Sequence, residues 1–303
     1  AWVTDTLERA LGHSVESTIC RLETDKFDMQ IIDTPGHLTY LQNAVTGMAQ
    51  ADVAVLVVSA APGELEAGLG PGGLTKEHAV LAHTLGAKRV IVVISKMDAT
   101  EFSQKRFDAA KKEVAAALKS GGINPKGVAF LPISGLKGDN VYLAAGRCSW
   151  FEGWTAGPIS GTSLLSALNA MTPPDRGDAP LRLSVERVLE VKGVGAVSLG
   201  RVESGVLKAG SQVVISPGGF TCEVKSIECH HTRVESATAG DVVGLCLDLP
   251  SGTIERGMVV GDAENDPPRE EGFTAQIMIR TTPGVIRVGS TATLDCGTAH
   301  VPV

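Results

Sequence analysis

Residues 29–37 read MQIIDTPGH, a short apolar run followed at once by a turn that carries an acidic residue. The run at 29–32 predicts a buried strand, so Asp33 stands at the carboxyl end of that strand. An aspartate in this place can hold Mg²⁺ through water, and Gly36 lets a backbone amide approach a terminal phosphate. The alternative is an ordinary turn of the same composition without a ligand. The stretch therefore predicts either one wall of a nucleotide site or a plain connection.

From this stretch as far as residue 171, strand-like apolar runs alternate with longer amphipathic segments. This alternation predicts a doubly wound α/β sheet that is covered by helices. Strands are predicted at 29–32, 53–59, 90–94 and 129–133, and helices at 39–48, 75–85, 102–119 and 162–171.

Residues 172–180 interrupt the pattern with three prolines and one glycine, which can continue neither a helix nor a central strand. Beyond them, short β-type runs separated by glycine turns predict a small closed barrel, and a second break follows at 265–268. We expect an α/β domain at 1–174, a barrel domain at 175–267 and the truncated beginning of a second barrel at 268–303. Barrel strands are predicted at 181–189, 196–203, 212–216, 222–229 and 242–249, and further strands at 273–280 and 290–296.

A second polar turn, Ser95-Lys96-Met97-Asp98, follows the predicted strand at 90–94 and therefore lies at the same edge of the sheet as the first turn. Guanine presents an N1–H and an exocyclic amine side by side, and one carboxylate accepts both hydrogen bonds. The stem of Lys96 can cover the face of the base, with Ser95 beside it. Asp98 is the candidate guanine reader.

A third turn, Ser134-Gly135-Leu136, follows the predicted strand at 129–133. A small residue and a backbone amide in this place can meet the carbonyl oxygen of guanine. Alone the turn is not diagnostic, but three loops in this order at strand ends converge on one pocket. We therefore expect the three turns to form a guanine-nucleotide site.

The composition is that of a globular protein. Hydrophobic residues make up 43% of the chain, yet apolar runs reach only about ten residues, short of the roughly 20 that a membrane helix needs. The formal charge of −7 gives no net attraction for a polyanion. The six cysteines include no C-x-x-C pair, which argues against a zinc knuckle and a disulfide framework. We expect a cytoplasmic protein of a reducing compartment with no membrane partner.

Together the three turns resemble the third, fourth and fifth sequence motifs of the translational GTPases. Within that superfamily, the chain is most similar to the elongation factor 1-alpha family of eukaryotes and archaea. The resemblance extends over nearly the whole chain, through 50–52, 63–68, 75–79, 132–135, 138–140, 200–203 and 272–276.

The resemblance implies GTP or GDP and Mg²⁺ as cofactors, if a phosphate-binding loop is supplied upstream. It places His37 where the family has the histidine that positions the attacking water. It places Ser14 where the family has a threonine that binds Mg²⁺, together with Asp33. The implied partners are aminoacyl-tRNA, which such factors deliver to the ribosome, and a nucleotide exchange factor.

The chain departs from the family pattern at the nucleotide site itself. The phosphate-binding P-loop, G-x-x-x-x-G-K-[ST], should precede residue 29, yet the dipeptide Gly-Lys occurs nowhere in the sequence. Ser95 replaces the asparagine of the family's N-K-x-D motif, and residues 38–40 read Leu-Thr-Tyr in place of Arg-Asp-Phe. The segment around Ser14 is also shorter than the first switch of the family. The substitutions thus concentrate on nucleotide chemistry.

Two hypotheses remain open. Either the chain is an elongation-factor-1-alpha-like GTPase whose P-loop segment lies upstream of Ala1, or it is a pseudo-GTPase that serves as a module in a larger assembly of protein partners without turnover. In the family's sheet, the P-loop strand lies between the strand that ends at Asp33 and the strand at 53–59. We expect an upstream segment or a partner's strand to fill that gap, and residues 1–303 alone to aggregate through exposed strand edges.

Overall fold

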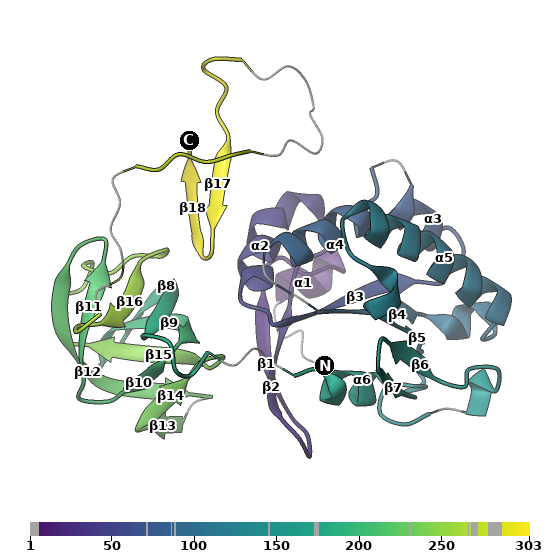
Figure 1. The fold of residues 1–303 in the computed structure, drawn as a ribbon, viewed down its shortest axis with the longest axis horizontal. Helices are drawn as coiled ribbons and strands as arrows, with labels where there is room; N and C mark the ends of the chain where they lie inside the picture. The colour runs from purple at the N-terminus through teal and green to yellow at the C-terminus, as the bar shows by residue number, and fades with distance from the viewer. Residues whose placement is uncertain are drawn as a thin grey trace. The chain divides into compact units, whose positions relative to one another are not determined.

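The computed structural model describes residues 6–70, 72–85, 87, 89–144, 146–172, 176–230, 232–265, 267, 272–277 and 287–303. The chain divides into two compact units, Ala1–Pro174 and Asp175–Val303, and each is described by itself (Figure 1). Among the helices in these ranges, none is long and apolar enough to cross a membrane.

The first unit is built on a parallel sheet with the strand order β3-β4-β5. β3 is Val53–Ser59, β4 is Arg89–Ser95 and β5 is Ala129–Pro132. These strands alternate with helices in sequence, as predicted. The helices are α1 Thr6–Leu11, α2 Leu41–Ala49, α3 Glu64–Leu69, α4 Thr75–Thr84, α5 Gln104–Ser120 and α6 Leu164–Ala170, with 3-10 turns η1 Leu38–Tyr40, η2 Met97–Thr100, η3 Pro125–Gly127 and η4 Gly146–Cys148 and a small hairpin of β6 Trp154–Ala156 and β7 Ile159–Gly161.

Helices cover both faces of this sheet, because successive residues of a strand point to opposite sides. On one side, Val92 and Ile94 of β4 pack in a buried cluster with Phe107 of α5. On the other side, Ile91 and Val93 pack in a second cluster that includes the small hairpin and α6. All four β4 side chains are at most 1% exposed. The doubly covered α/β sheet predicted from the sequence is confirmed.

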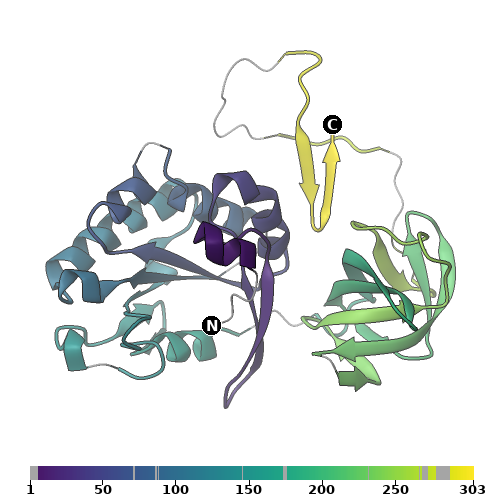
Figure 2. The same cartoon turned by 180° about the vertical axis from the view of Figure 1, so that it is seen from behind.

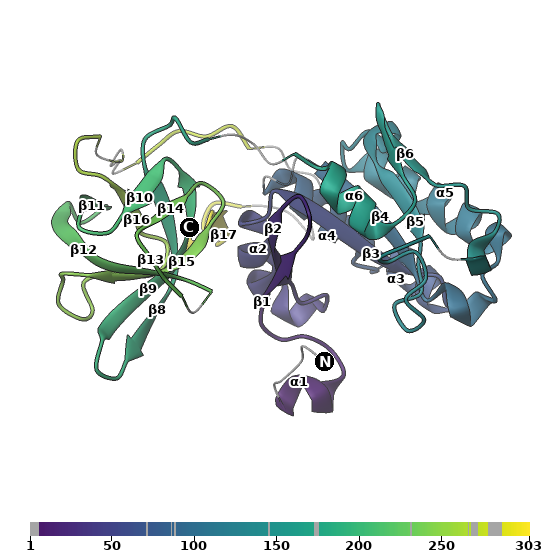
Figure 3. The same ribbon diagram turned by 90° about the horizontal axis from the view of Figure 1, so that it is seen from below.

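A separate two-stranded sheet precedes it in the chain. β2, Asp28–Asp33, pairs antiparallel with β1, Thr18–Glu23, and the described strands of this hairpin share no ladder with β3 (Figures 2 and 3). The sequence predicted β2 but not β1. The six residues TICRLE of β1 mix apolar and charged side chains, and the burial alternates only weakly along them.

The helices expected at 75–85 and 162–171 are present as α4 and α6 with ends shifted by one or two residues, and α1 and α3 were not predicted. The other two expected helices differ more. The helix expected at 102–119 begins at Gln104, because Glu101 and Phe102 adopt positive φ angles of 51° and 55° and Ser103 caps the helix by accepting from the Arg106 amide. The helix expected at 39–48 is divided into η1 and α2.

The second unit contains the predicted closed barrel. Its strands β11, β16, β8, β9, β15 and β12 pair in that order, and a further β11–β12 pairing closes the ring. The interior is filled by side chains such as Leu183, Val213 and Leu245, each 0% exposed. The strands are β8 Arg182–Val191, β9 Gly195–Ser204, β11 Gln212–Ser216, β12 Phe220–Cys229, β15 Val242–Leu247 and β16 Val259–Asp262, with the short β10 Val206–Lys208, β13 Thr232–Val234 and β14 Ser236–Thr238.

A hairpin of β17, Thr293–Cys296, and β18, Ala299–Pro302, follows the barrel in the chain. Its turn contacts the barrel through Thr298, whose hydroxyl donates to the Val185 carbonyl at 2.7 Å. The strand expected at 273–280 is wrong over its described part, since residues 273–277 form no strand, and residues 278–280 lie outside the described ranges. Phe273 is 73% exposed there. The division into three domains stays a prediction.

Candidate functional site

The loop after β2 carries the first group of predicted site residues. Asp33 closes the strand, Pro35 is buried, and Gly36 and His37 are exposed. A Cβ built on Gly36 would meet open space, and the φ angle of Gly36 is not in the left-handed region. Neither packing nor backbone conformation within the described residues therefore requires a glycine at this position.

The carboxyl group of Asp33 has a neighbour that the sequence did not reveal. Its pKa is raised, first because partial burial disfavours the charged form and second because the Glu8 carboxylate lies nearby. Glu8 is held in place by the Val15 amide, which donates to Oε1 at 2.7 Å. This bond also fixes the segment that contains Ser14, which is half-buried. A cation beside Asp33 would relieve the repulsion between the two carboxylates.

His37 packs in a small aromatic group that joins this segment to the β2 loop. The rings of His13 and His37 are stacked with centroids 5.1 Å apart and an interplanar angle of 11°, and Tyr40 lies 6.1 Å from His37. The Thr39 amide donates to Nδ1 of His37 at 3.3 Å. The stacking of His13 on His37 therefore places the segment that contains Ser14 next to His37, the predicted water-positioning residue.

A second group of predicted residues meets at the ends of β4 and β5. The hydroxyl of Ser134 donates to Oδ1 of Asp98 at 2.6 Å and accepts from the Lys137 amide at 3.1 Å. Ser134 is 0% exposed and Asp98 is half-buried. The Met97 amide also donates to the Ile133 carbonyl at 3.2 Å. The two loops are thus joined by side-chain and backbone bonds, and the carboxylate of Asp98 is oriented.

The remaining residues of these loops are less enclosed. Ser95 is half-buried at the end of β4, while Gly135 and Leu136 are exposed, Leu136 by 81%. Lys96 has left-handed backbone angles, φ 57° and ψ 34°, and its Nζ lies 2.7 Å from Oε2 of Glu64 in α3. The structure therefore brings together Asp98 and Ser134, with Lys96 beside Asp98 in the same loop.

No hydrogen bond or ion pair in the described ranges joins this second group to the Asp33 and His37 group. Among those residues there is also no cluster of three or more histidine, cysteine or acidic side chains that could hold a metal ion. The site therefore consists of two separately built halves, one suited to a base and the other to a cation and an anionic group.

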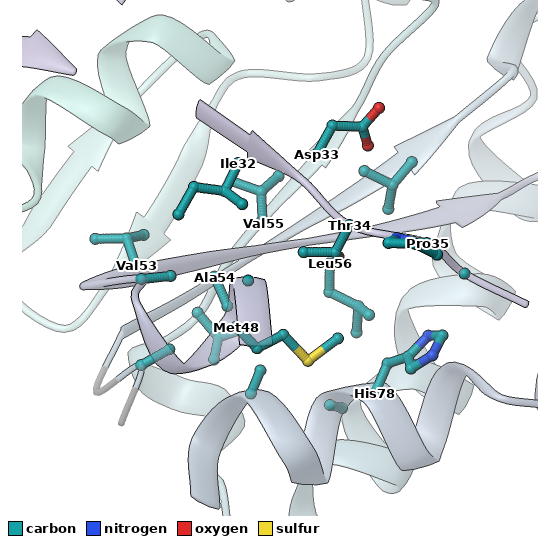
Figure 4. Close-up of a pocket in the computed structure, with 18 residues that line it drawn as sticks. Ile32, Asp33, Thr34, Pro35, Met48, Val53, Ala54, Val55, Leu56 and His78 are labelled. Carbon is teal, nitrogen blue, oxygen red and sulfur yellow. The ribbon is translucent and has the colours of Figure 1, made fainter. Parts of the chain in front are cut away.

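Between β2 and β3 lies a groove with a volume of about 320 Å³, which we call the β2–β3 groove (Figure 4). Within the described residues, β2 pairs only with β1 and β3 only with β4, so each strand has one edge without a partner strand. Val57 of β3 is 63% exposed. The groove is lined by residues of β2 and the turn after it (Ile32, Asp33, Thr34, Pro35, Gly36), of α2 and after it (Gly47, Met48, Ala51), of β3 (Val53, Ala54, Val55, Leu56, Val57), and of α4, β4 and the segment between them (His78, Ala79, Ala82, Ala87, Val90).

His78 of α4, one of the residues that line this groove, carries a buried polar atom. Nε2 of His78 in α4 is shielded from solvent and has no hydrogen-bond partner among the described residues. The pKa of His78 is lowered, chiefly because burial disfavours the charged imidazolium. A buried nitrogen without a partner is uncommon in a complete core, where nearly all such groups are bonded.

Comparison with known proteins places the chain in a family. The domain described as "Elongation factor Tu GTP binding domain" matches residues 3–174, and "Elongation factor Tu domain 2" matches residues 195–261. The oocyte form of elongation factor 1-alpha from Xenopus laevis is 47% identical over 312 residues, covering 99% of this chain and 68% of the relative. The chain belongs to the GTP-binding elongation factor family. Elongation factor 1-alpha from Neurospora crassa is 44% identical, with 99% of this chain and 67% of the relative covered.

A solved structure agrees with the fold of this chain. The bacterial selenocysteine-specific elongation factor EF-Sec superposes with a TM-score of 0.68 at 25% identity, covering 86% of this chain. The match spans 40% of the length of that structure. The resemblance to translation factors stated from the sequence is confirmed, and so is the sequence-based fold class.

The sequence did not predict the involvement of three residues beside the site. Glu8, His13 and Glu64 contact or influence predicted residues, but each does so across a loop or between elements. Glu64 lies within the stretch 63–68, which resembles the family. That resemblance indicates the segment but does not predict a partner for the Glu64 side chain. His13 stood in the shortened switch, where the sequence directed attention to Ser14 alone.

Proposed function

We propose that this elongation factor binds guanine nucleotide with Mg²⁺ and carries aminoacyl-tRNA to the ribosome, with a phosphate-binding strand that completes its sheet in the β2–β3 groove. The single observation that carries the proposal is the groove itself. It separates two strand edges that have no partner strand in the described part of the chain, it adjoins Asp33 and Gly36, and its walls are largely apolar.

An added strand would supply hydrogen-bond partners for the backbone groups along the free edges of β2 and β3. The described residues of β2 and β3 are mostly half-buried or exposed, so water can reach their free edges in residues 1–303. An added strand would replace this water with strand pairing and would protect two edges that could otherwise pair with another chain. A strand between β2 and β3 would pair with both and cover Val57. The loop that leaves its carboxyl end would then arrive at the same edge as Asp33, where parallel sheets bind their ligands.

The base half supports guanine as the nucleotide. A carboxylate offers about four lone-pair sites on its two oxygens, so the bond from Ser134 to Oδ1 of Asp98 leaves sites for two further donors. Guanine presents two adjacent N–H donors to such a carboxylate, and adenine does not. Because the Ser134 bond exists before any ligand arrives, the carboxylate is pre-oriented for this pairing.

The other half supports Mg²⁺ and phosphate. Asp33 and the hydroxyl of Ser14 are the side chains that would hold the ion, in part through water, and a cation there would offset the repulsion between the Asp33 and Glu8 carboxylates. Magnesium would offset the charge of the phosphates. Gly36, for which neither packing nor φ demands a glycine, would allow close approach of its amide to a phosphate.

His37 would orient the attacking water once it leaves its contact with His13. An exchange factor and a cytoplasmic location accompany this proposal through the similarity to elongation factor 1-alpha. The proposal for tRNA rests on the same similarity, which extends across the barrel domain at residues 195–261.

A second candidate function is a pseudo-GTPase, in which a strand from a protein partner fills the groove and no turnover occurs. The stacked contact of His37 with His13 favours it, because the ring is engaged with its own chain. The serine at position 95 favours it as well, since it offers no amide to the base.

Competition titrations of GDP and ADP against the full gene product, at millimolar Mg²⁺, test the proposal. We expect GDP to bind at least a hundredfold more tightly than ADP, and the difference to vanish in Asp98→Asn. Equal affinity of the two nucleotides for the unaltered protein would favour the pseudo-GTPase. Turnover of GTP to GDP in the presence of ribosomes would then separate the carrier from a binding module.

A further inference from the structure

A chain of contacts runs from α5 to the loop that carries Asp98. It begins at Arg106, in the first turn of α5, whose side chain is 23% exposed. Its Nε donates to the Ala60 carbonyl at 2.8 Å, its Nη2 donates to the Ala61 carbonyl at 3.2 Å, and its Nη1 donates to Oε1 of Glu66 at 2.7 Å. One planar guanidinium therefore clamps both the turn after β3 and the start of α3.

The clamp is ionic at neutral pH. The hydrogen bond from Arg106 lowers the pKa of Glu66 to about 2. Glu66 also accepts from the Gly63 amide at 2.9 Å, which closes the first turn of α3. The first turn of α3 is thereby a fixed support and not a free loop end.

Glu64 stands on this support, two residues before Glu66. Its Oε2 lies 2.7 Å from Nζ of Lys96, and its pKa is lowered first by this bond and next by a bond with Ser59 at the end of β3. The Lys96 ammonium is thus the close hydrogen-bond partner of this carboxylate. Sequence separation between Glu64 and Lys96 is large, so only the fold brings the two together.

Lys96 is fixed at its other end as well. Its backbone has left-handed angles, the Ala99 amide donates to its carbonyl at 3.0 Å, and the next residue, Met97, is 0% exposed. A lysine with contacts at both the backbone and the ammonium has fewer rotamers to lose on binding than a surface lysine without an ion pair. Ordering such a flexible side chain otherwise counts against binding.

We propose that Glu64, supported by the Arg106 clamp, is a positioning residue that orients the stem of Lys96 so that it can cover the face of a guanine base. This inference rests on the proposed function, in which the 95–98 loop reads guanine. Glu64 itself does not touch the nucleotide. It acts through Lys96, so its removal weakens binding without changing which base Asp98 recognises.

The competing explanation is an ordinary surface ion pair. The side chains of Lys96 and Glu64 are 55% and 51% exposed, and pairs with such exposure contribute little to folding. A surface pair without a positioning role would leave nucleotide affinity unchanged when it is broken. The two explanations therefore differ in a ligand-binding measurement and not in a stability measurement.

The test is a double-mutant cycle in the full gene product, with Glu64→Gln, Lys96→Met and the double variant, and with GDP and ADP as probes. We expect Glu64→Gln to weaken GDP binding about threefold at low salt. We expect it to have no further effect once Lys96 is replaced. Because the pair is exposed, the loss should disappear near 1 M salt, where the Debye length is about 3 Å.

Glu77→Gln is the matched control, since Glu77 is an exposed acidic residue in the first turn of the neighbouring helix α4 and should leave GDP affinity unchanged. An unaltered protein that prefers GDP, combined with equal GDP affinity in Glu64→Gln, overturns the positioning role alone. The same loss with Lys96→Met already in place also overturns it. An unaltered protein without a preference for GDP overturns the proposed function, and the positioning role with it.

Discussion

The hydrogen bond from Ser134 to Asp98 can both stabilise the fold and orient the Asp98 carboxylate for guanine. Replacing Ser134 by alanine separates these two roles. The Ser134 hydroxyl donates to Asp98 at 2.6 Å and accepts from the Lys137 amide at 3.1 Å, and Ser134 is 0% exposed. A hydrogen bond to a charged group contributes about 1.5 to 3 kcal/mol. We expect Ser134→Ala to lower the free energy of unfolding by about that amount.

The expected effect on binding is smaller and has a different origin. The Ser134 bond is present with and without nucleotide, so its own strength largely cancels in the affinity. What is lost is the orientation of the Asp98 carboxylate, which must then be ordered when the ligand binds, at about 0.5 to 1.5 kcal/mol. At roughly 1.4 kcal/mol per factor of ten, GDP should bind about two- to twelvefold more weakly. Binding of ADP should change little.

Ser163→Ala is the matched control for this comparison. Ser163 is a buried serine, 4% exposed, whose hydroxyl caps α6 by accepting from the Ser166 amide at 3.2 Å. Its loss should cost about 0.5 to 2 kcal/mol of stability, comparable to the loss in Ser134→Ala. Urea unfolding and competition titrations of GDP and ADP measure both quantities. If both variants kept the GDP-to-ADP ratio of the unaltered protein, Ser134 would have no part in orienting Asp98.

Three further predictions concern the same unit. Asp98→Asn should abolish the preference for guanine, because an amide in place of the carboxylate cannot accept from both guanine donors, and a variant that still favours GDP over ADP would contradict the assignment. The raised pKa of Asp33 means that its charge destabilises the folded state above that pKa and ceases to do so as the pH falls through it. Asp33→Asn should therefore raise the melting temperature at pH 7 without Mg²⁺ and remove any stabilisation by Mg²⁺. A lower melting temperature of this variant in metal-free buffer would refute the electrostatic argument. Residues 1–303 alone should bind a fluorescent GTP analogue at least a hundredfold more weakly than an intact relative, about 2.7 kcal/mol, and sub-micromolar affinity would exclude a need for an added strand.

The sequence predicted those parts of the site that depend on local pattern. Asp98 and Ser134 follow apolar runs that become adjacent strands, so their proximity follows from the order of the sheet. Asp33 was correctly placed at the end of a strand, but that strand pairs antiparallel with β1 and, among the described residues, shares no ladder with the parallel sheet, so its expected place at the same sheet edge is not seen. The positions of Asp98 and Ser134 require only the strand period and the rule that parallel strands end at a common edge.

The rest depends on contacts that have no local signature. Glu64 and Lys96 meet because α3 is clamped by Arg106, and no spacing in the sequence encodes that clamp. His13 reaches His37 through the path of a loop. β1 was missed because its side chains are half polar and its strand character comes from pairing with β2. The segment 273–277 shows the converse, since strand-like residues without a described partner form no strand.

Amide hydrogen exchange along β3, Val53–Ser59, shows whether the sheet lacks a strand, because alternate amides of this strand face β4 and the β2–β3 groove. In residues 1–303 alone, kept dilute so that the exposed strand edges do not aggregate, we expect protection of the amides that face β4 and fast exchange of those that face the groove. In the full gene product with GDP and Mg²⁺, we expect protection of both sets. Equal protection of both sets in dilute residues 1–303 would refute the proposed added strand, because the sheet would then be complete without it.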